Sequence, residues 1–269
     1  MLVDSHCHLD YPDLAADLDG VLARAEAAGV GRVVTISTHV ARARIYEALA
    51  ERDARVFSTI GTHPHYAGEE PDTRVETLVA LARHPRCIAI GEAGLDFHYD
   101  KSPRDVQAHV FRTHIAAARE SGLPLVIHAR EADAEMIAIL SEEMARGRFS
   151  AVLHCFSSGA ELARVGVELG LYVSFSGIVT FNRSEELRAI ARSVPLERIL
   201  VETDAPYLAP QPKRGKPNEP AYVAMTAASL AQTLGLTPDA LARATTANFY
   251  RLLAKAAALD GVLAGEGAA

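Results

Sequence analysis

Residues 124–132 read PLVIHAREA, an apolar run that ends in a histidine and is followed at once by charged residues. Short apolar runs with polar borders are typical of strands in a buried parallel sheet. Seven further runs of this kind lie at residues 2–6, 32–37, 56–63, 87–94, 151–156, 171–177 and 199–206. With the run at 124–129 included, the starts lie roughly 28 residues apart, which leaves room for one helix and two loops between successive strands.

The segments between these runs carry helix signals, such as a capping Ser102 before the segment that ends at Gly122. Eight strand and helix units in 269 residues, 49% of them hydrophobic, predict a (β/α)8 TIM barrel of the α/β class. We expect a single domain over residues 1–255, with an extra C-terminal helix over about 238–255 and a flexible tail over 256–269. An open, doubly wound sheet in two domains is the alternative, but no linker rich in Pro, Gly or Ser divides the chain.

The composition excludes several classes of protein. The 27 basic and 34 acidic residues give a formal charge of −7, which argues against nucleic-acid binding through the whole surface. No basic residue precedes Arg24, and the longest uncharged run, at 220–238, contains polar residues, so we expect neither a secretory signal nor a membrane span. The three cysteines, Cys7, Cys87 and Cys155, fit reduced thiols. These features predict a cytoplasmic protein with no membrane contact, and no pattern indicates an obligate protein partner.

Histidines and acidic residues gather at the C-terminal ends of the predicted strands. In chain order they are His6, His8, His63, Glu92, His128, His154 and Asp204. These ends converge on one face of a TIM barrel, the face on which active sites of this fold are built. Imidazoles and carboxylates bind Zn²⁺ and similar divalent ions, and such a set suffices for two ions that share a bridging group. A single histidine of this kind is usually structural, but the shared placement predicts a metal site.

Spacing refines this prediction. His6 and His8 lie two residues apart, so an extended strand projects both to the same side and lets them hold one ion together. His109 and His114 lie five apart on a predicted helix, not on one face, and are interpreted as solvated or packing residues. His65 lies in a loop on the expected active face, where it can contact a substrate.

Seven segments, in order and at compatible spacing, strongly resemble the TatD family of metal-dependent deoxyribonucleases, within the amidohydrolase-like metal hydrolases. They are DSHCHLD at 4–10, IGTHPH at 60–65, AIGEAGLDFHYD at 89–100, PLVIHAREA at 124–132, LHCFSSG at 153–159, SFSGIVTF at 174–181 and VETDAPYLAP at 201–210. The resemblance covers nearly the whole chain and implies the same barrel fold.

The resemblance also implies a centre with two divalent metal ions per chain, which are Zn, Mg or Mn. The implied ligands are His6, His8 and Asp204 for the first ion, His128 and His154 for the second, and Glu92 as the bridge. The implied activity is hydrolysis of phosphodiester bonds in DNA, typically as a 3′–5′ exodeoxyribonuclease on single strands. We expect a metal-bound hydroxide to attack phosphorus, with Glu92 as the bridging catalytic carboxylate and Asp204 as the proton acceptor.

Several further residues are candidates for substrate contacts with DNA or a short oligonucleotide end. They are His63, His65, Arg130, Glu202, Lys213, Arg214 and Lys216. The last three belong to the loop after the eighth strand, and loops in that position often bind phosphate in barrels. Glu202 precedes Asp204 by two residues on the same strand, so both side chains should face the same side. Glu202 then positions substrate, orients a metal ligand or is a buried hydrogen-bonding residue.

Two other functions stay open at this point. The same centre can hydrolyse small amides, lactones, phosphoesters or tRNA-linked esters, and a metal-binding protein without catalysis is the second alternative. Glu92 stands where some related barrels use a carboxylated lysine as the bridge, and this favours the DNase-like branch. The negative charge favours a short nucleic-acid end over a wrapped duplex. The native metal, DNA against RNA, the cleavage polarity and the oligomeric state are left open.

Overall fold

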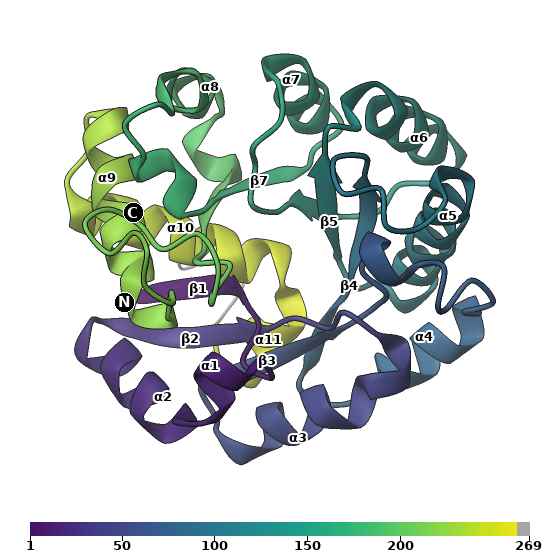
Figure 1. Ribbon diagram of the computed structural model, residues 1–269, viewed down its shortest axis with the longest axis horizontal. Coiled ribbons are helices and arrows are strands. Elements are labelled where there is room, and N and C mark those ends of the chain that lie inside the picture. Colours follow the sequence, from purple (N-terminus) through teal and green to yellow (C-terminus); the bar gives the residue numbers. More distant parts are fainter. Residues whose placement is uncertain (263–269) are drawn as a thin grey trace.

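A computed structural model describes residues 1–262 and contains one eight-stranded parallel sheet, in the order β1 to β8, rolled into a nearly closed barrel (Figure 1). The strands are β1 (Leu2–Cys7), β2 (Val30–Thr35), β3 (Val56–Ile60), β4 (Cys87–Asp96), β5 (Leu125–Arg130), β6 (Ala151–Leu153), β7 (Tyr172–Phe175) and β8 (Ile199–Val201). Each strand overlaps one of the predicted runs. The TIM-barrel prediction is therefore confirmed.

The helices surround the strands (Figure 1). They are α1 (Pro12–Ala15), α2 (Leu18–Ala27), α3 (Ala43–Arg52), α4 (Val75–Leu81), α5 (Arg104–Ser121), α6 (Asp133–Arg146), α7 (Ala160–Glu168), α8 (Glu185–Ser193), α9 (Val223–Leu234), α10 (Pro238–Leu252) and α11 (Ala254–Leu259). Short 3-10 turns occupy Val40–Arg42, Pro64–Tyr66, Gly177–Thr180, Leu196–Arg198 and Pro220–Tyr222. Within residues 1–262, no helix has the length and apolar character that a membrane crossing requires.

The first and last strands meet through their C-terminal ends. Cys7 forms a parallel bridge with Ala205, and the Asp204 N–H donates to the His6 carbonyl at 2.9 Å. The His8 N–H in turn donates to the Ala205 carbonyl at 2.8 Å. Because this contact joins segments about 200 residues apart, it closes the barrel at the end where the predicted ligands lie.

The barrel interior near the strand starts is apolar. Every strand contributes to this layer, which includes Val3, Val34, Phe57, Ile88, Val126, Val152, Tyr172 and Leu200. The neighbouring residues on β5, Leu125 and Ile127, instead face the helices, as the alternation of side chains in a strand requires. The same alternation carries the inward direction two residues on, from Val126 to His128 and from Val152 to His154. The apolar layer and the polar site are thus successive levels of one interior.

The C-terminal helices cover this apolar layer from outside the barrel. Phe249, Tyr250, Leu252, Leu253 and Ala256 belong to the same buried cluster as the eight strand residues. The helix predicted over about 238–255 is α10, which ends at Leu252, and the chain turns at Leu253 into the short helix α11, which completes the cover.

The structure corrects the prediction of a flexible tail over 256–269 for its first residues. Ala256 is fully buried beneath the barrel, and Asp260 accepts two hydrogen bonds of 2.8 Å from Arg32 and one of 2.7 Å from the Tyr250 hydroxyl. Small alanines gave no periodic signal in the sequence, yet their size lets α11 pack closely against the strands. Residues 263–269 of the predicted tail lie outside the described residues.

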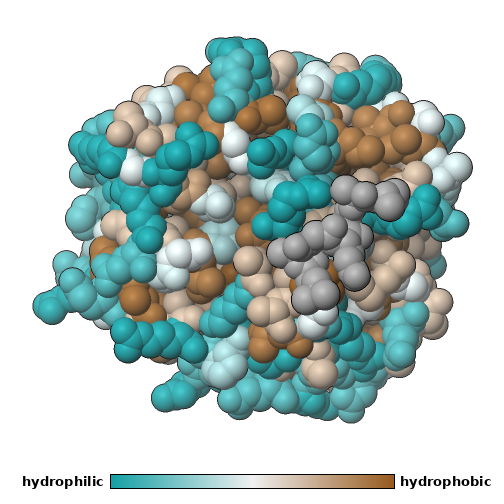
Figure 2. All heavy atoms as spheres, turned by 180° about the vertical axis from the view of Figure 1, so that it is seen from behind, coloured by the Kyte–Doolittle hydropathy of each residue, from teal (hydrophilic) through white to brown (hydrophobic). Residues whose placement is uncertain are grey.

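The face of the molecule that points away from the viewer in Figure 1 is largely polar at its periphery. Figure 2 shows hydrophilic side chains in teal around this face, with hydrophobic areas between them. In the described part of the chain, the strongly exposed large hydrophobic residues are Met1, Ile45, Tyr99, Tyr207, Leu259 and Val262. Two of these, Tyr99 and Tyr207, belong to the cavity described below.

His114 on α5 holds the loop that follows β3. Its Nε2 accepts a hydrogen bond of 3.0 Å from the Thr62 N–H, and its Nδ1 lies 2.8 Å from the Val110 carbonyl. The ring is fully buried, and burial lowers its pKa to about 4. His114 is therefore a neutral packing residue, as its helical position indicated, and it fixes the backbone next to His63.

This burial predicts a pH-dependent stability. Because the pKa of His114 is depressed in the folded state, the unfolded chain binds the proton first, and stability present above pH 6.5 is lost as the pH falls toward 4. The loss between pH 7 and pH 5 should be on the order of 2 kcal/mol. Urea unfolding at the two pH values measures it, and His114→Gln, which can still accept from Thr62, should show a smaller fall. His109→Gln, at an exposed site of the same helix, is the control. An equal fall in His114→Gln and wild type would contradict the assignment.

Candidate metal centre

The Glu92 carboxylate is the centre of the polar site at the barrel mouth. Its Oε1 lies 2.6 Å from His154 Nε2 and 2.8 Å from His128 Nδ1. Its Oε2 lies 3.4 Å from His6 Nε2. The two oxygens of one buried carboxylate therefore face imidazoles from different strands on two sides.

Asp204 completes the side of the site formed by β1. Its Oδ1 lies 3.5 Å from His8 Nε2 and 3.7 Å from His6 Nε2. Burial alone would raise the pKa of Asp204, but the contact with His8 and the charges of His6 and His8 outweigh it and hold the pKa below its ordinary value. All six residues predicted as ligands are thus brought to one place, and both carboxylates are ionised.

Asp4 fixes the turn that presents Asp204. It lies one level deeper in the barrel, is fully buried, and accepts hydrogen bonds from the Thr203 N–H at 2.8 Å and the Thr203 hydroxyl at 2.6 Å. Burial raises the pKa of Asp4 to about 8. Asp204 itself has a φ of 58°, a backbone conformation that is uncommon for residues other than glycine. The Asp4 contacts and the barrel closure together hold this turn in place.

Glu202 lies behind the site and does not reach the cavity. It is fully buried, and its Oε1 accepts from the Cys155 N–H at 2.7 Å and lies 3.3 Å from His154 Nδ1. The position does not fit the substrate-binding role predicted for Glu202. It fits the two other roles that the sequence left open, orientation of a metal ligand, here His154, and a buried hydrogen-bonding residue. The charges of Glu92 and Glu202 overcome the effect of burial and raise the pKa of His154 well above its ordinary value.

Asp96 is a member of the site that the sequence reading missed. Its Oδ2 lies 2.8 Å from His65 Nε2 and 3.1 Å from His128 Nε2. The alternation of side chains along a strand could have identified it. β4 extends to Asp96, and residues 92, 94 and 96 lie on the same side of an extended strand. Asp96 therefore orients both rings from the edge of the barrel.

His63 lies close to Glu92 but differs from the predicted ligands. Its Nε2 is 3.4 Å from Glu92 Oε1, while its Nδ1 accepts a hydrogen bond of 3.0 Å from the His65 N–H. A neutral ring that accepts at Nδ1 carries its proton on Nε2. Burial lowers the pKa of His63 well below its ordinary value, so the ring is neutral and offers an N–H toward the site.

The donor atoms fit divalent cations. Buried polar atoms without a hydrogen-bond partner in the described structure include both ring nitrogens of His6, Nδ1 of His8 and Oε2 of Glu92. Leaving such atoms unpaired costs about 1–3 kcal/mol each, and nitrogen and carboxylate lone pairs that converge are the ligands of Zn²⁺ and related ions. The donor atoms of His6, His8 and Glu92 lie within 4.8 Å of one another.

A cavity of about 450 Å³ opens over the centre. It is lined by His8, Tyr11, Thr38, His63, His65, Tyr66, Glu92, Asp96, Tyr99, Lys101, His128, Arg130, His154, Asp204, Tyr207 and Leu208. Of the predicted substrate contacts, His63, His65 and Arg130 are in this set. The four tyrosines and Lys101 were not predicted, because each comes from a loop whose course the sequence pattern did not define.

The three basic residues of the loop after β8 are not among the residues that line the cavity. The Arg214 guanidinium lies 3.9 Å from the ring centre of Phe181, and the Lys213 ammonium lies 5.1 Å from that of Tyr222. Lys216 donates its backbone N–H to the Lys213 carbonyl, within the same loop. The positions of Lys213, Arg214 and Lys216 therefore give no support to the predicted contact with substrate phosphate.

The chain is similar to known metal-dependent hydrolases over nearly its whole length. The metal-dependent hydrolase YcfH of Escherichia coli K12 is 45% identical over 255 residues, which cover 93% of this chain and 95% of that protein. The 3′-5′ ssDNA/RNA exonuclease TatD of Citrobacter koseri is 36% identical over 93% of this chain and 98% of its own. The crystal structure of the TatD homologue YjjV from Escherichia coli superposes with a TM-score of 0.88 at 29% identity, covering 94% and 98% of the two chains.

The family model described as TatD related DNase matches residues 3–254. This range contains β2 to β8, all of β1 except Leu2, and every residue of the candidate metal centre. The chain therefore belongs to the TatD-related DNase family.

Proposed function

We propose that this protein is a phosphodiester hydrolase that removes nucleotides from an end of single-stranded DNA, using two divalent ions. The observation that carries the proposal is the Glu92 carboxylate, whose two oxygens face separate groups of imidazoles. Such a carboxylate suits a bridge between two cations.

In the proposed centre, His6, His8 and Asp204 would hold one ion, and His128 and His154 would hold the other, with Glu92 available to both. Two cations there would lower the pKa of a bound water and neutralise charge that develops on phosphate oxygens. The residues around them supply orientation. Asp96 and Glu202 fix the rings of His128 and His154, and Asp4 fixes the turn that carries Asp204.

Asp204 is the proposed proton acceptor. It is ionised, it lines the cavity with its side chain 15% exposed, and its Oδ1 lies 3.5 Å from His8 Nε2. A carboxylate in this position can take the proton of the attacking water and pass it to the leaving oxygen. The His63 N–H, which points toward Glu92, is placed to donate to a phosphate oxygen.

The cavity supports a single nucleotide end as the substrate. Arg130 is placed over the Tyr99 ring at 4.7 Å, and Lys101 lies 5.7 Å from the same ring centre. Two cations for phosphate beside an exposed aromatic ring are the combination that single-stranded nucleic acid requires. Tyr207 lies on the opposite part of the lining, 5.9 Å from Tyr11. A volume of about 450 Å³ is suited to one or two nucleotides and not to a duplex. The name of the Citrobacter relative is consistent with this substrate.

Metal binding provides the first test. At saturation, we expect two divalent ions per chain by elemental analysis, and Glu92→Gln should reduce both the number and the affinity because the shared ligand loses its charge. Glu161→Gln, on the exposed surface of α7, is the matched control and should bind as wild type does. One ion or none at saturation in the wild type would refute the dinuclear centre.

Hydrolysis provides the second test. End-labelled single-stranded DNA with Mg²⁺, Mn²⁺ or Zn²⁺ should be shortened by the wild type, and Asp204→Asn should lower kcat by roughly 10²–10⁴-fold through loss of the proton acceptor. Asp239→Asn, at an exposed site on α10, should retain activity. Parallel assays of RNA and of small esters and amides separate the alternatives. Cleavage of a small ester or amide without release of nucleotide would remove the nucleic-acid substrate but leave the metal hydrolase.

Substrate stacking provides the third test. Tyr99→Ala should raise KM for single-stranded DNA by roughly 5- to 100-fold with kcat little changed, because one base loses its aromatic partner. Tyr99→Phe should restore most of the affinity, since the ring remains. Tyr222→Ala, outside the cavity lining, is the control. An unchanged KM in Tyr99→Ala would exclude stacking at this position.

A further inference from the structure

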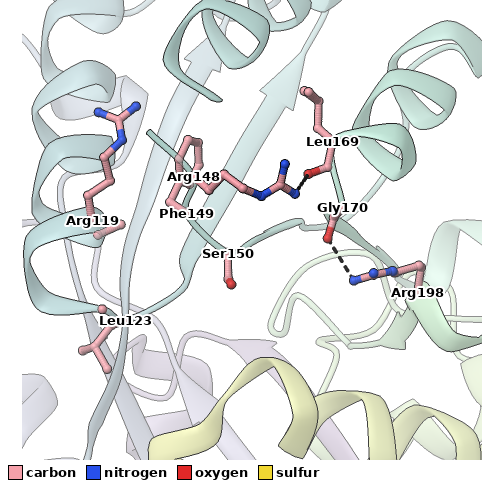
Figure 3. Close-up of a pocket in the computed structure, with 10 residues that line it drawn as sticks. Arg119, Leu123, Arg148, Phe149, Ser150, Leu169, Gly170 and Arg198 are labelled. Carbon is pink, nitrogen blue, oxygen red and sulfur yellow. Dashed lines mark hydrogen bonds between the residues drawn. The ribbon is translucent and has the colours of Figure 1, made fainter. Parts of the chain in front are cut away.

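A second cavity, of about 410 Å³, lies at the other end of the barrel from the metal centre. Its lining comes from the segments that immediately precede β5, β6, β7 and β8 (Figure 3). These segments include Leu123, Ser150, Gly170 and Arg198. The cavity is therefore formed where the strands begin, while the metal centre is formed where they end.

Three arginines line this cavity, and two of them are held by adjacent carbonyl groups. Arg148 Nη2 donates to the Leu169 carbonyl at 3.1 Å, and Arg198 Nη1 donates to the Gly170 carbonyl at 2.9 Å (Figure 3). These carbonyls belong to the end of α7, where Gly170 has a φ of +91°. The backbone thus brings two guanidinium groups to neighbouring points of one wall.

Acidic residues do not neutralise this pair. Within residues 1–262, neither Arg148 nor Arg198 has a carboxylate within salt-bridge distance, in a chain whose formal charge is −7. The third arginine, Arg119, pairs with Glu143 at 2.7 Å, and Glu142 and Glu143 both pair with Arg112 and Arg146. Two carboxylates shared by three guanidinium groups leave this part of the surface with an excess of one positive charge. The cavity therefore concentrates positive charge that the protein itself does not balance.

We propose that this cavity binds a phosphate dianion, either as free phosphate or as the phosphate group of a nucleoside monophosphate. A guanidinium has five N–H donors, and the carbonyl contacts use one donor each of Arg148 and Arg198. The remaining donors form the planar fork that matches phosphate oxygens. Ser150 adds a hydroxyl to the same lining. Phosphate binding here is independent of the function proposed for the metal centre.

The lining also explains why the ligand is a small anion. It contains no aspartate or glutamate, which excludes a cation site in this cavity. Arginines at a helix end commonly do no more than satisfy its carbonyls and dipole. That role accounts for each arginine separately, but it does not account for two uncompensated charges that meet in one concave space.

Calorimetric titration of metal-free protein tests the proposal, with inorganic phosphate in one arm and deoxyadenosine monophosphate in the other. We expect saturable binding in the wild type and about a tenfold or greater rise in Kd for Arg148→Ala and for Arg198→Ala, because each removes charge-assisted hydrogen bonds. Arg148→Lys and Arg198→Lys should retain part of the affinity. Arg164→Ala, an exposed arginine on α7 that pairs with Glu161 and Glu168, should bind as the wild type does.

Arg130→Ala separates this cavity from the metal centre, since Arg130 lines only the cavity above Glu92. Loss of phosphate binding in the Arg148 and Arg198 variants but not in Arg130→Ala supports the proposal, and the arm with the lower Kd identifies the source of the phosphate. Melting curves without ligand verify that each variant is folded, and the exposed Arg148 keeps the test usable if Arg198→Ala does not fold. No binding in the millimolar range, or binding that is unchanged in folded Arg148 and Arg198 variants, overturns it.

Discussion

The buried charge of Glu92 is the constraint on which the rest of the site depends. A carboxylate that is 1% exposed remains ionised only where positive charge or cations compensate the lost hydration. Its pKa is held well below the ordinary value despite burial, chiefly by the charge of His154, with further contributions from its contacts with His63, His6 and His128. These rings come from the ends of different strands, so the compensation exists only when those strand ends meet.

One physical reason allowed the sequence to predict both the fold and the histidines and carboxylates that meet at the centre of the site. In a parallel barrel the strands are apolar and alternate, so the polar residue that interrupts each run marks a strand end, and all eight ends meet. His128 and His154 could be placed in this way because each follows an inward-facing valine by two residues. No loop geometry entered the prediction.

The residues that sequence reasoning misplaced depend on loops or on close packing. Tyr99 and Lys101 enter the cavity from the loop after β4, and Lys213 turns away in the loop after β8, although both loops lie on the same face. Which side of a loop faces the cavity is decided by tertiary contacts such as the stacking of Lys213 on Tyr222. Glu202 was placed correctly in the interior. Its contact with the Cys155 N–H depends on a positive φ at Cys155, which the sequence pattern did not predict.

The apolar layer and its helical cover have a consequence for synthesis of the chain. All eight strands supply the layer, but its cover comes from Phe249, Leu253 and Ala256, which are synthesised after every strand. A nascent chain that has completed β8 therefore carries an uncovered apolar ring, the kind of surface that chaperones bind and that leads incomplete chains to aggregate. The hydrogen bonds between Arg32 and Asp260 then join β2 to the segment after α11, so the cover is tied to a strand that is synthesised more than 200 residues earlier.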